Sequence, residues 1–521
     1  MRKIAYIIAA FSIFATASAQ TPVLRHGDCM PMQENTSVPS HQQASRRLPA
    51  INTQWDASRT YHQAVLLIEF ADEGFTLSDD PHAYYDAMFN QQGYSQRQGA
   101  GSFADYFRDQ SRGLFNLQCD IYGPYKVSTK AQPYDNPTEN TRNFGSNVMK
   151  EATQMWIDAN PSLNYKQYDW NGDGTIEQII YIAAGKTGNQ DASECYGYIW
   201  PNTSSFSTIK APDETRINSY TISNETWNNG TSCGIGTICH EYAHSLGLPD
   251  IYPAHNGWIF SAVDEWDLMD GGNFTNYGSC PPNFSPLEKM LLGWYTPIEL
   301  TTGTTITNMK PLAEDGDAYI VKHTDDEYLL LENRQQRGWD VGAPGKGLIV
   351  YHVNYKPQNW KDNSVNDTQD KPNYHLVAAD NRNDYNTCVA YIKTAGLKQY
   401  AKSNRMNSNV FSLAPYPWEE TAETIHDSLT DTSLPATEMY NNNTQSSTLL
   451  SKPITHITMT ADGLISFDFM GGDPTGIKDL TPALSLGEGA VYDLSGRKTS
   501  TGKRGIYIIR LSDGTIKKVF K

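Results

Sequence analysis

The chain has 521 residues, of which 39% are hydrophobic and 11% aromatic, a composition sufficient for ordinary globular cores that excludes a disordered protein. Its formal net charge of −17 argues against nucleic acids and anionic membrane surfaces as partners, because both are bound through clustered Lys and Arg. At this length we expect two to four domains.

Residues 1–19 have the pattern of a secretory signal peptide. Arg2 and Lys3 supply positive charge, residues 4–14 form an apolar stretch, and Ala17-Ser18-Ala19 is a small-residue cleavage site. No cysteine follows that site, and no later run is long and apolar enough to span a membrane. We therefore expect a protein that is secreted or held at the cell surface, without a transmembrane segment.

Residues 20–60 are polar and show no clear periodicity, so they are predicted to be a leader, interpreted as a pro-segment of a zymogen. Arg46-Arg47 would suit a trypsin-like processing protease. Cys29 could bind the metal predicted below at residues 240–250 as a thiolate before processing. The alternative is a linker with an incidental cysteine.

The chain contains seven cysteines, which would permit up to three disulfide bonds and leave at least one thiol. Cys233 and Cys239 are close enough in sequence to pair. Cys239 would equally suit a small core position, and we favour the unpaired form.

Residues 61–300 are predicted to form a mixed α/β (α+β) domain, which contains the candidate catalytic residues described below. Short apolar runs of the kind found in buried strands lie at 64–70 and 178–185, and amphipathic helices are predicted at 102–111 and 149–159.

A candidate calcium loop interrupts this region, because oxygen-bearing side chains alternate there and glycines permit a sharp turn. Its candidate ligands are Asp169, Asn171, Asp173, Thr175 and Glu177. The first half matches an EF-hand loop, but position twelve would be an isoleucine, so Glu177 would have to close a shorter loop. The alternative is a plain Asp/Asn/Gly turn.

Residues 240–250, HEYAHSLGLPD, predict a zinc site. On a helix, His240 and His244 are one turn apart on the same face, near enough for both imidazoles to reach one Zn²⁺. Glu241 lies beside them and is the candidate catalytic base for a metal-bound water. The alternative is two solvated histidines on an ordinary helix.

A catalytic zinc usually has three protein ligands. Asp250 is the favoured third ligand, because Gly247 permits the left-handed turn that would end the helix and bring the chain back toward the metal. Glu265, on a later helix, is the alternative. The following segment, WDLMDGG at 266–272, resembles the Met-containing turn beneath the zinc of metzincins, and Met269 there would be structural.

Residues 301–470 are predicted to form a β-rich, sandwich-like domain. Strand-like runs lie at 318–321, 328–331 and 348–351, separated by Gly, Pro, Asn and Asp. Residues 355–450 are poor in apolar runs, so we expect long loops there rather than a second core.

Residues 471–521 are predicted to form a small C-terminal β module, with strands at 490–493 and 505–510. Its segments at 491–497, 503–508 and 517–521 resemble the C-terminal sorting domain of type IX secretion cargo, which implies the secretion machinery as a partner. The usual Pro-Asn-Pro opening is absent, and a small β accessory module is the competing interpretation.

Several blocks together resemble the immune inhibitor A family of secreted zinc endopeptidases, over roughly residues 64–355. They are HExxHxxGLPD, WDLMDGG, the Lys-x3-Gly-Trp helix ending at 294, and the segments at 332–335, 338–340 and 347–352. The resemblance implies a metzincin-like domain, zinc bound by His240, His244 and Asp250, Glu241 as base, and calcium as a frequent structural ion.

The prediction is therefore a secreted zinc metalloendopeptidase acting on protein or peptide substrates. The alternative, from another class, is a surface adhesin or protein-binding module on an inactive peptidase scaffold. The four intact residues of the predicted zinc site argue against that alternative.

Overall fold

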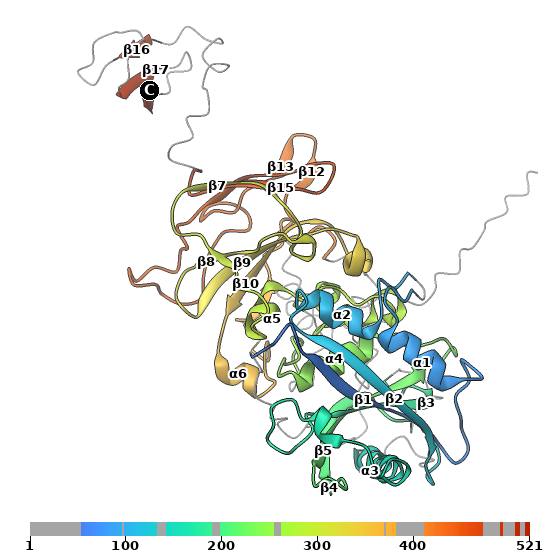
Figure 1. The fold of residues 1–521 in the computed structure, drawn as a ribbon. Coiled ribbons are helices and arrows are strands. Elements are labelled where there is room, and N and C mark those ends of the chain that lie inside the picture. The colour runs from blue at the N-terminus through green and yellow to red at the C-terminus, as the bar shows by residue number, and fades with distance from the viewer. Residues whose placement is uncertain are drawn as a thin grey trace, which may run out of the picture.

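A computed structural model of the protein describes residues 54–95, 98–132, 142–189, 198–254, 262–368, 371–381 and 411–472, together with three C-terminal strands (Figure 1). The predicted signal peptide, Cys29 and the Arg46-Arg47 pair lie outside the described residues.

The N-terminal half is built on a five-stranded sheet of order β2-β1-β3-β5-β4. β1 runs parallel to β2 and β3, and β3 runs parallel to β5, whereas the edge strand β4 is antiparallel to β5. The strands are β1 (Thr60–Glu69), β2 (Asn116–Lys126), β3 (Ile179–Lys186), β4 (Asn202–Lys210) and β5 (Arg216–Thr226). The buried strands predicted at 64–70 and 178–185 are thus confirmed as β1 and β3.

Helices cover both faces of this sheet because β1 is apolar on both sides. Successive side chains of a strand point to opposite faces. Tyr61, Val65 and Leu67 accordingly enter one core with α1 (Pro81–Asn90), α2 (Phe103–Gln110) and α4 (Gly236–Ser245). Ala64, Leu66 and Ile68 enter a second core with α3 (Arg142–Ala159). The predicted helices at 102–111 and 149–159 are confirmed as α2 and α3, and α3 begins earlier, at Arg142.

A second five-stranded sheet, of order β11-β10-β9-β8-β6, follows in the C-terminal half. Its strands are β6 (Ile298–Glu299), β8 (Tyr319–Lys322), β9 (Glu327–Arg334), β10 (Gly347–Asn354) and β11 (Tyr374–Leu376). The strands predicted near 318, 328 and 348 are confirmed as β8, β9 and β10. A three-stranded sheet of order β14-β15-β7 lies beyond, with β7 (Thr304–Met309), β14 (Ile454–Met459) and β15 (Ile465–Phe469).

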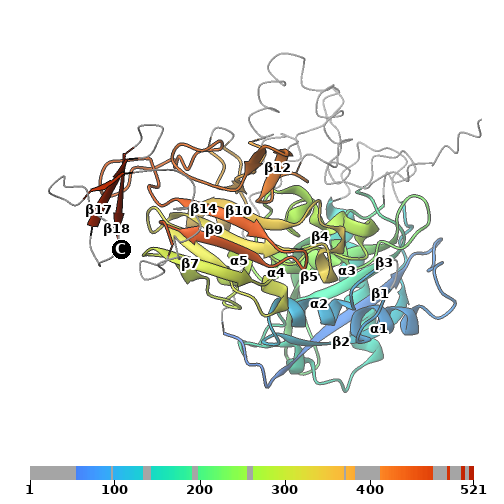
Figure 2. The same cartoon turned by 90° about the horizontal axis from the view of Figure 1, so that it is seen from above.

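Both faces of the second sheet are buried, and one of them faces the N-terminal half. Leu330 and Ile349 share a core with α4 and with α5 (Pro286–Leu291), while Leu331 and Val350 pack toward β14 and β15. Figures 1 and 2 both draw α4 and α5 between the first sheet and β9 and β10. One hydrophobic core therefore continues across residue 300, where we predicted a boundary between domains.

The described part of residues 355–450 is mostly loop, as expected. It includes only short elements, namely α6 (Pro357–Lys361), β11, β12 (Trp418–Thr421) and β13 (Thr424–His426). Its loops nevertheless supply Leu429, Met439 and Leu450 to the core around β14 and β15. Short helices elsewhere are η2 (Tyr165–Tyr168), η4 (Asp264–Trp266), η5 (Gly271–Gly278), η6 (Leu312–Glu314) and η7 (Gly338–Gly342).

Three antiparallel strands lie near the C-terminus, β16 (Ala490–Tyr492), β17 (Ile506–Arg510) and β18 (Ile516–Phe520). They confirm the strands predicted at 490–493 and 505–510. Their proposed use as a sorting module remains a prediction.

Cys233 and Cys239 do not pair in the structure. Within the described ranges, Cys119, Cys239 and Cys280 are buried free thiols, and Cys233 is buried as well. None of the described helices is long and apolar enough to cross a membrane.

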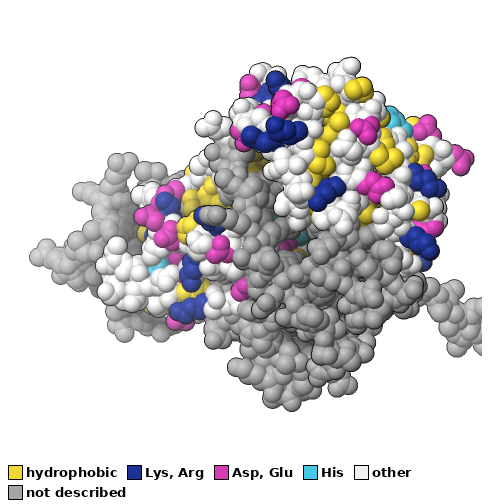
Figure 3. Space-filling view, turned by 90° about the horizontal axis from the view of Figure 1, so that it is seen from below, with side chains coloured by type: hydrophobic (Ala, Val, Ile, Leu, Met, Phe, Trp, Pro, Cys, Tyr) yellow, Lys and Arg dark blue, Asp and Glu magenta, His cyan; other side chains and the backbone are white. Residues whose placement is uncertain are grey.

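Figure 3 shows basic and acidic side chains interspersed over the described part of one face.

Candidate metal centre

Helix α4 holds the first two predicted ligands and ends where the sequence predicts. Gly247 has a φ of +100°, a left-handed conformation that glycine adopts without strain. The amide of Leu248 donates to the carbonyl of Ala243 at 3.1 Å, and that of Gly247 donates to the carbonyl of His244 at 3.0 Å. This pair of bonds is a Schellman motif, which turns the chain back toward the helix.

Hydrogen bonds to carbonyl groups fix the tautomers of both histidines. Nδ1 of His240 lies 2.8 Å from the carbonyl oxygen of Leu268, and Nδ1 of His244 lies 2.7 Å from that of Leu248. Because a carbonyl can only accept, each Nδ1 is assigned the hydrogen. Each Nε2 is therefore left with a free lone pair, the form in which imidazole binds a metal.

Asp250 joins these two nitrogens. Its Oδ1 lies 3.2 Å from Nε2 of His240 and 3.2 Å from Nε2 of His244. The three ligand atoms lie within 4.8 Å of one another, and all three residues are buried. Ligands about 2.0–2.1 Å from a tetrahedral zinc would be about 3.3 Å apart, so the two distances fit zinc.

The charges at this centre also fit a cation. Burial alone would lower the pKa of His240, but Asp250 and Glu241 outweigh it and raise the pKa to about 9. Burial would raise the pKa of Asp250, yet the two histidines hold it well below its usual range. Oδ1 of Asp250 receives no hydrogen bond when both Nε2 atoms carry lone pairs. The cluster thus needs a positive charge at its centre, from a proton or a metal ion.

Glu241, the predicted base, is buried on α4 beside His240. Its Oε2 is buried and has no hydrogen-bond partner among the described residues. Its carbonyl oxygen accepts a hydrogen bond from Thr203 Oγ1 on β4, so the edge strand of the first sheet lies alongside the helix.

The alternative third ligand, Glu265, is not a member of this cluster. It lies in the single turn of η4, half-buried. The cluster that the structure brings together is therefore His240, His244 and Asp250.

The segment containing Met269 lies against the centre. Its Leu268 carbonyl accepts from His240, and the Met269 carbonyl accepts from the amide of Ile251 at 2.8 Å. Gly272 allows the chain to fold this tightly, because a Cβ there would lie 2.4 Å from the carbonyl oxygen of Asp267. Met269 itself is fully buried, as expected for a structural residue.

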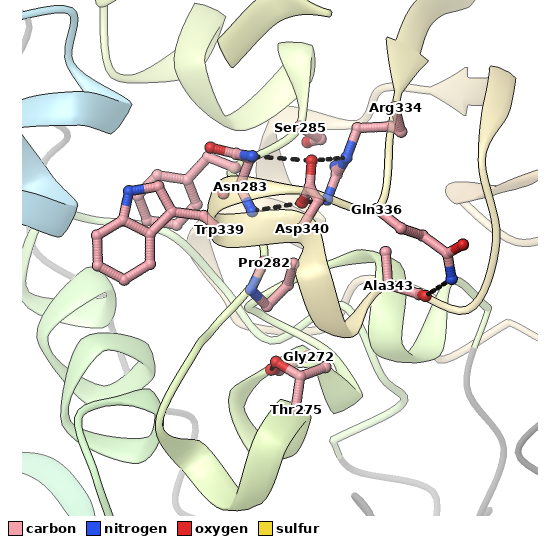
Figure 4. A network of polar contacts seen from close by, with 12 residues as sticks. Gly272, Thr275, Pro282, Asn283, Ser285, Arg334, Gln336, Trp339, Asp340 and Ala343 are labelled. Atoms are coloured by element: carbon pink, nitrogen blue, oxygen red, sulfur yellow. Dashed lines mark hydrogen bonds and ion pairs between the residues drawn. The ribbon is translucent and has the colours of Figure 1, made fainter. Parts of the chain in front are cut away.

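A buried polar network fixes the chain before α5 to the second sheet (Figure 4). The guanidinium of Arg334 on β9 donates to both carboxylate oxygens of Asp340. Asn283 donates to the same carboxylate from its amide nitrogen at 3.0 Å and from Nδ2 at 2.8 Å. The blocks at 332–335 and 338–340, noted only through the family resemblance, thus have a structural explanation.

Sequence analysis did not identify Asn363, which hydrogen bonds to Asp250. Its Nδ2 donates to Asp250 Oδ2 at 2.7 Å, and its Oδ1 accepts from the amide of Asp250 at 2.6 Å. The two residues are 113 positions apart. A lone asparagine in a polar stretch gives no signal of such a contact in one sequence.

The predicted calcium loop is a turn in which the side chains bond to the loop's own backbone. Asp169 accepts from the amides of Gly172 and Gly174, each at 2.8 Å, and Glu177 accepts from the amides of Trp170 and Asn171. Burial raises the pKa of Glu177 to about 7, with Asp169 contributing in the same direction. Among the His, Cys, Asp and Glu side chains in the described part of the chain, only His240, His244 and Asp250 bring three ligand atoms close together. Calcium therefore remains a prediction.

The fold and this centre are similar to those expected of metallopeptidases as a class. Residues 58–293 match the family model described as immune inhibitor A peptidase M6, catalytic domain. This match agrees with the resemblance to the immune inhibitor A family that the sequence blocks indicated.

Two relatives make the similarity specific. The chain is 25% identical over 269 residues to immune inhibitor A of Bacillus thuringiensis subsp. alesti, a match covering 43% of this chain and 38% of that protein. It is 26% identical over 245 residues to pre-pro-metalloprotease PrtV of Vibrio cholerae, covering 41% of this chain and 26% of that protein. The similarity thus spans well under half of either relative.

Proposed function

We propose that the protein is a zinc-dependent endopeptidase that hydrolyses peptide bonds of protein substrates. One observation supports this most strongly: Nε2 of His240, Nε2 of His244 and Oδ1 of Asp250 converge in a buried site, and that Oδ1 receives no hydrogen bond from any of the described residues. Such a site favours a cation, and two nitrogens with one oxygen are a typical ligand set for catalytic zinc. The match to a peptidase M6 catalytic domain supports the same conclusion.

His240, His244 and Asp250 would hold the zinc, which when bound activates a water and polarises the substrate carbonyl. Glu241 is assigned the role of general base. Its Oε2 is buried and has no hydrogen-bond partner among the described residues, so it is available to take up a proton and return it to the leaving amine.

Substrate is proposed to bind in extended form along β4. This strand is at the edge of the first sheet, and no described strand pairs with its outer side. An exposed strand edge can add a peptide as a further strand through main-chain hydrogen bonds. Thr203 of β4 donates to the backbone carbonyl of Glu241, so such a peptide would lie along the strand next to the helix that carries the base.

We also infer that the enzyme is exported and is made in a latent form. We infer a signal peptide at 1–19, a pro-segment at 20–60 cleaved near Arg46-Arg47, and a C-terminal module at 471–521 that addresses the chain to a secretion machinery. The name of the Vibrio relative describes a pre-pro-metalloprotease, which is in keeping with a leader of this kind.

Casein zymography of the processed protein tests the proposal. We expect cleavage that a zinc chelator abolishes and that added zinc restores. Cleavage that is absent, or that persists in chelator, would contradict it and favour the adhesin interpretation.

A further inference from the structure

The inferred third zinc ligand is held in place by a residue from the other half of the chain. Asp250 and Asn363 form a closed pair of hydrogen bonds, in which the amide nitrogen of Asp250 donates to Oδ1 of Asn363 and Nδ2 of Asn363 donates to Oδ2 of Asp250. One asparagine side chain thereby contacts both the backbone and the carboxylate of the same residue.

This pairing fixes the orientation of the carboxylate. A carboxylate rotates readily about its last side-chain bond, so either oxygen could face a metal. The bond from Asn363 occupies Oδ2 and leaves Oδ1 as the oxygen 3.2 Å from both histidine nitrogens. The loss of rotational freedom then occurs during folding and does not reduce the affinity for the metal.

Asn363 is itself firmly held. It is fully buried in the loop after α6 and has a φ of +54°, a left-handed conformation that asparagine tolerates better than most residues. Its neighbour Asn366 has a φ of +62°, and its Nδ2 donates to the carbonyl oxygens of Ile251 and Tyr374, each at 2.8 Å. Two asparagines of one loop thus bind two successive residues at the metal centre.

The opposite side of the same turn is held by the Met269 segment. The amide of Ile251 donates to the carbonyl of Met269, while its carbonyl accepts from Asn366. The segment of Asp250 and Ile251 therefore lies between one contact from the peptidase-like region and one from the loop at 363–366. That loop lies beyond residue 293, where the match to the peptidase M6 catalytic domain ends.

We propose that Asn363 is a positioning residue for the zinc centre, and that the loop at 363–366 completes the centre by orienting the carboxylate of Asp250. This inference rests on the proposed zinc function. It predicts that residues 58–293 alone would form a weaker metal site than the whole chain.

The test measures zinc affinity in the full chain, with Asn363→Gly and Asn363→Ser as variants. Glycine keeps the left-handed backbone without strain, and serine keeps a hydroxyl too short to reach both partners. The matched control is Asn381→Gly, an exposed asparagine with the same φ of +54°. Zinc is removed with chelator, and its dissociation constant is measured by competition with a chromophoric chelator.

We expect both Asn363 variants to bind zinc about 10–100-fold more weakly than the parent, the range found when a residue that supports a metal ligand is removed. Peptidase activity should return at saturating zinc, and the control should match the parent. A lowered unfolding midpoint of the metal-free protein with unchanged zinc affinity would show a merely structural residue and overturn the inference. A parent chain that binds no zinc would instead refute the proposed function. If the glycine variant does not fold, the zinc affinity of the serine variant alone tests the inference.

Discussion

Two segments of this protein bring candidate metal ligands together. They differ in whether hydrogen bonds from the protein already occupy the lone pairs of those ligands. In the segment 240–250, both histidine Nδ1 atoms are directed to carbonyls, so two Nε2 atoms and one carboxylate oxygen converge at one point. In the loop 169–177, the carboxylates accept hydrogen bonds from the loop's own amides. A row of acidic residues is therefore weaker evidence for a metal than a small set of unsatisfied acceptors.

Burial adds to this difference. His244 and Asp250 are 1% and 2% exposed, so an uncompensated charge there would be costly. Asn171 and Asp173 of the acidic loop are exposed, and water can satisfy them. The first segment should thus depend on its ion for both folding and activity, and the second should respond weakly.

The largest effect is expected from Glu241→Gln. The amide keeps the size of the side chain but cannot take up a proton, so the cleavage rate should fall about a hundredfold or more while zinc remains bound. Peptidase assays on a fluorogenic peptide, with zinc content measured in the same samples, check this. A variant as fast as the parent would remove Glu241 from the mechanism.

Metal binding should separate the two candidates for the third ligand. Asp250→Asn removes the charge that faces both histidines, so zinc should no longer raise the unfolding midpoint, whereas Glu265→Gln should leave that rise intact. At free zinc one hundred times its dissociation constant, binding stabilises a protein by about 2.7 kcal/mol, enough to move the midpoint by several degrees. The reverse pattern would make Glu265 the ligand.

The zinc helix was predictable because its information is local. The spacing of His240 and His244, the glycine that ends the helix and the aspartate that follows all lie within eleven residues. The strands β1 and β3 were predictable for a similar reason, since both are continuous apolar runs buried on both faces.

What the sequence did not reveal depends on contacts between distant residues. The bonds between Asn363 and Asp250 span 113 positions, and those between Asn283 and Asp340 span 57. Neither asparagine has a neighbour in sequence that distinguishes it from the other polar residues of its loop. The continuity of the core across residue 300 is likewise decided by which face of the second sheet packs against α4 and α5.

Calcium should stabilise the acidic loop by less than zinc stabilises its centre. We expect millimolar calcium to raise the unfolding midpoint of the zinc-loaded parent by about 1–3 °C, and Asp169→Asn to abolish the rise, because Asp169 supplies acceptors at the start of the loop. Magnesium serves as the control, since it needs a more regular octahedral site. An equal rise in parent and variant would mean that calcium acts elsewhere.

The smallest effect is a pH dependence located at Glu177. Its folded pKa of about 7 lies above the ordinary value of 4.5, because burial and Asp169 disfavour the charged form. A group whose pKa is raised on folding stabilises the protein fully below its unfolded value, and that contribution is lost as the pH rises through 7. In calcium-free buffer the unfolding midpoint of the parent should therefore fall by a few degrees more between pH 5 and pH 8 than that of Glu177→Gln. Calcium would favour the carboxylate and flatten the difference, whereas identical pH profiles in parent and variant without calcium would show that Glu177 does not titrate in this range.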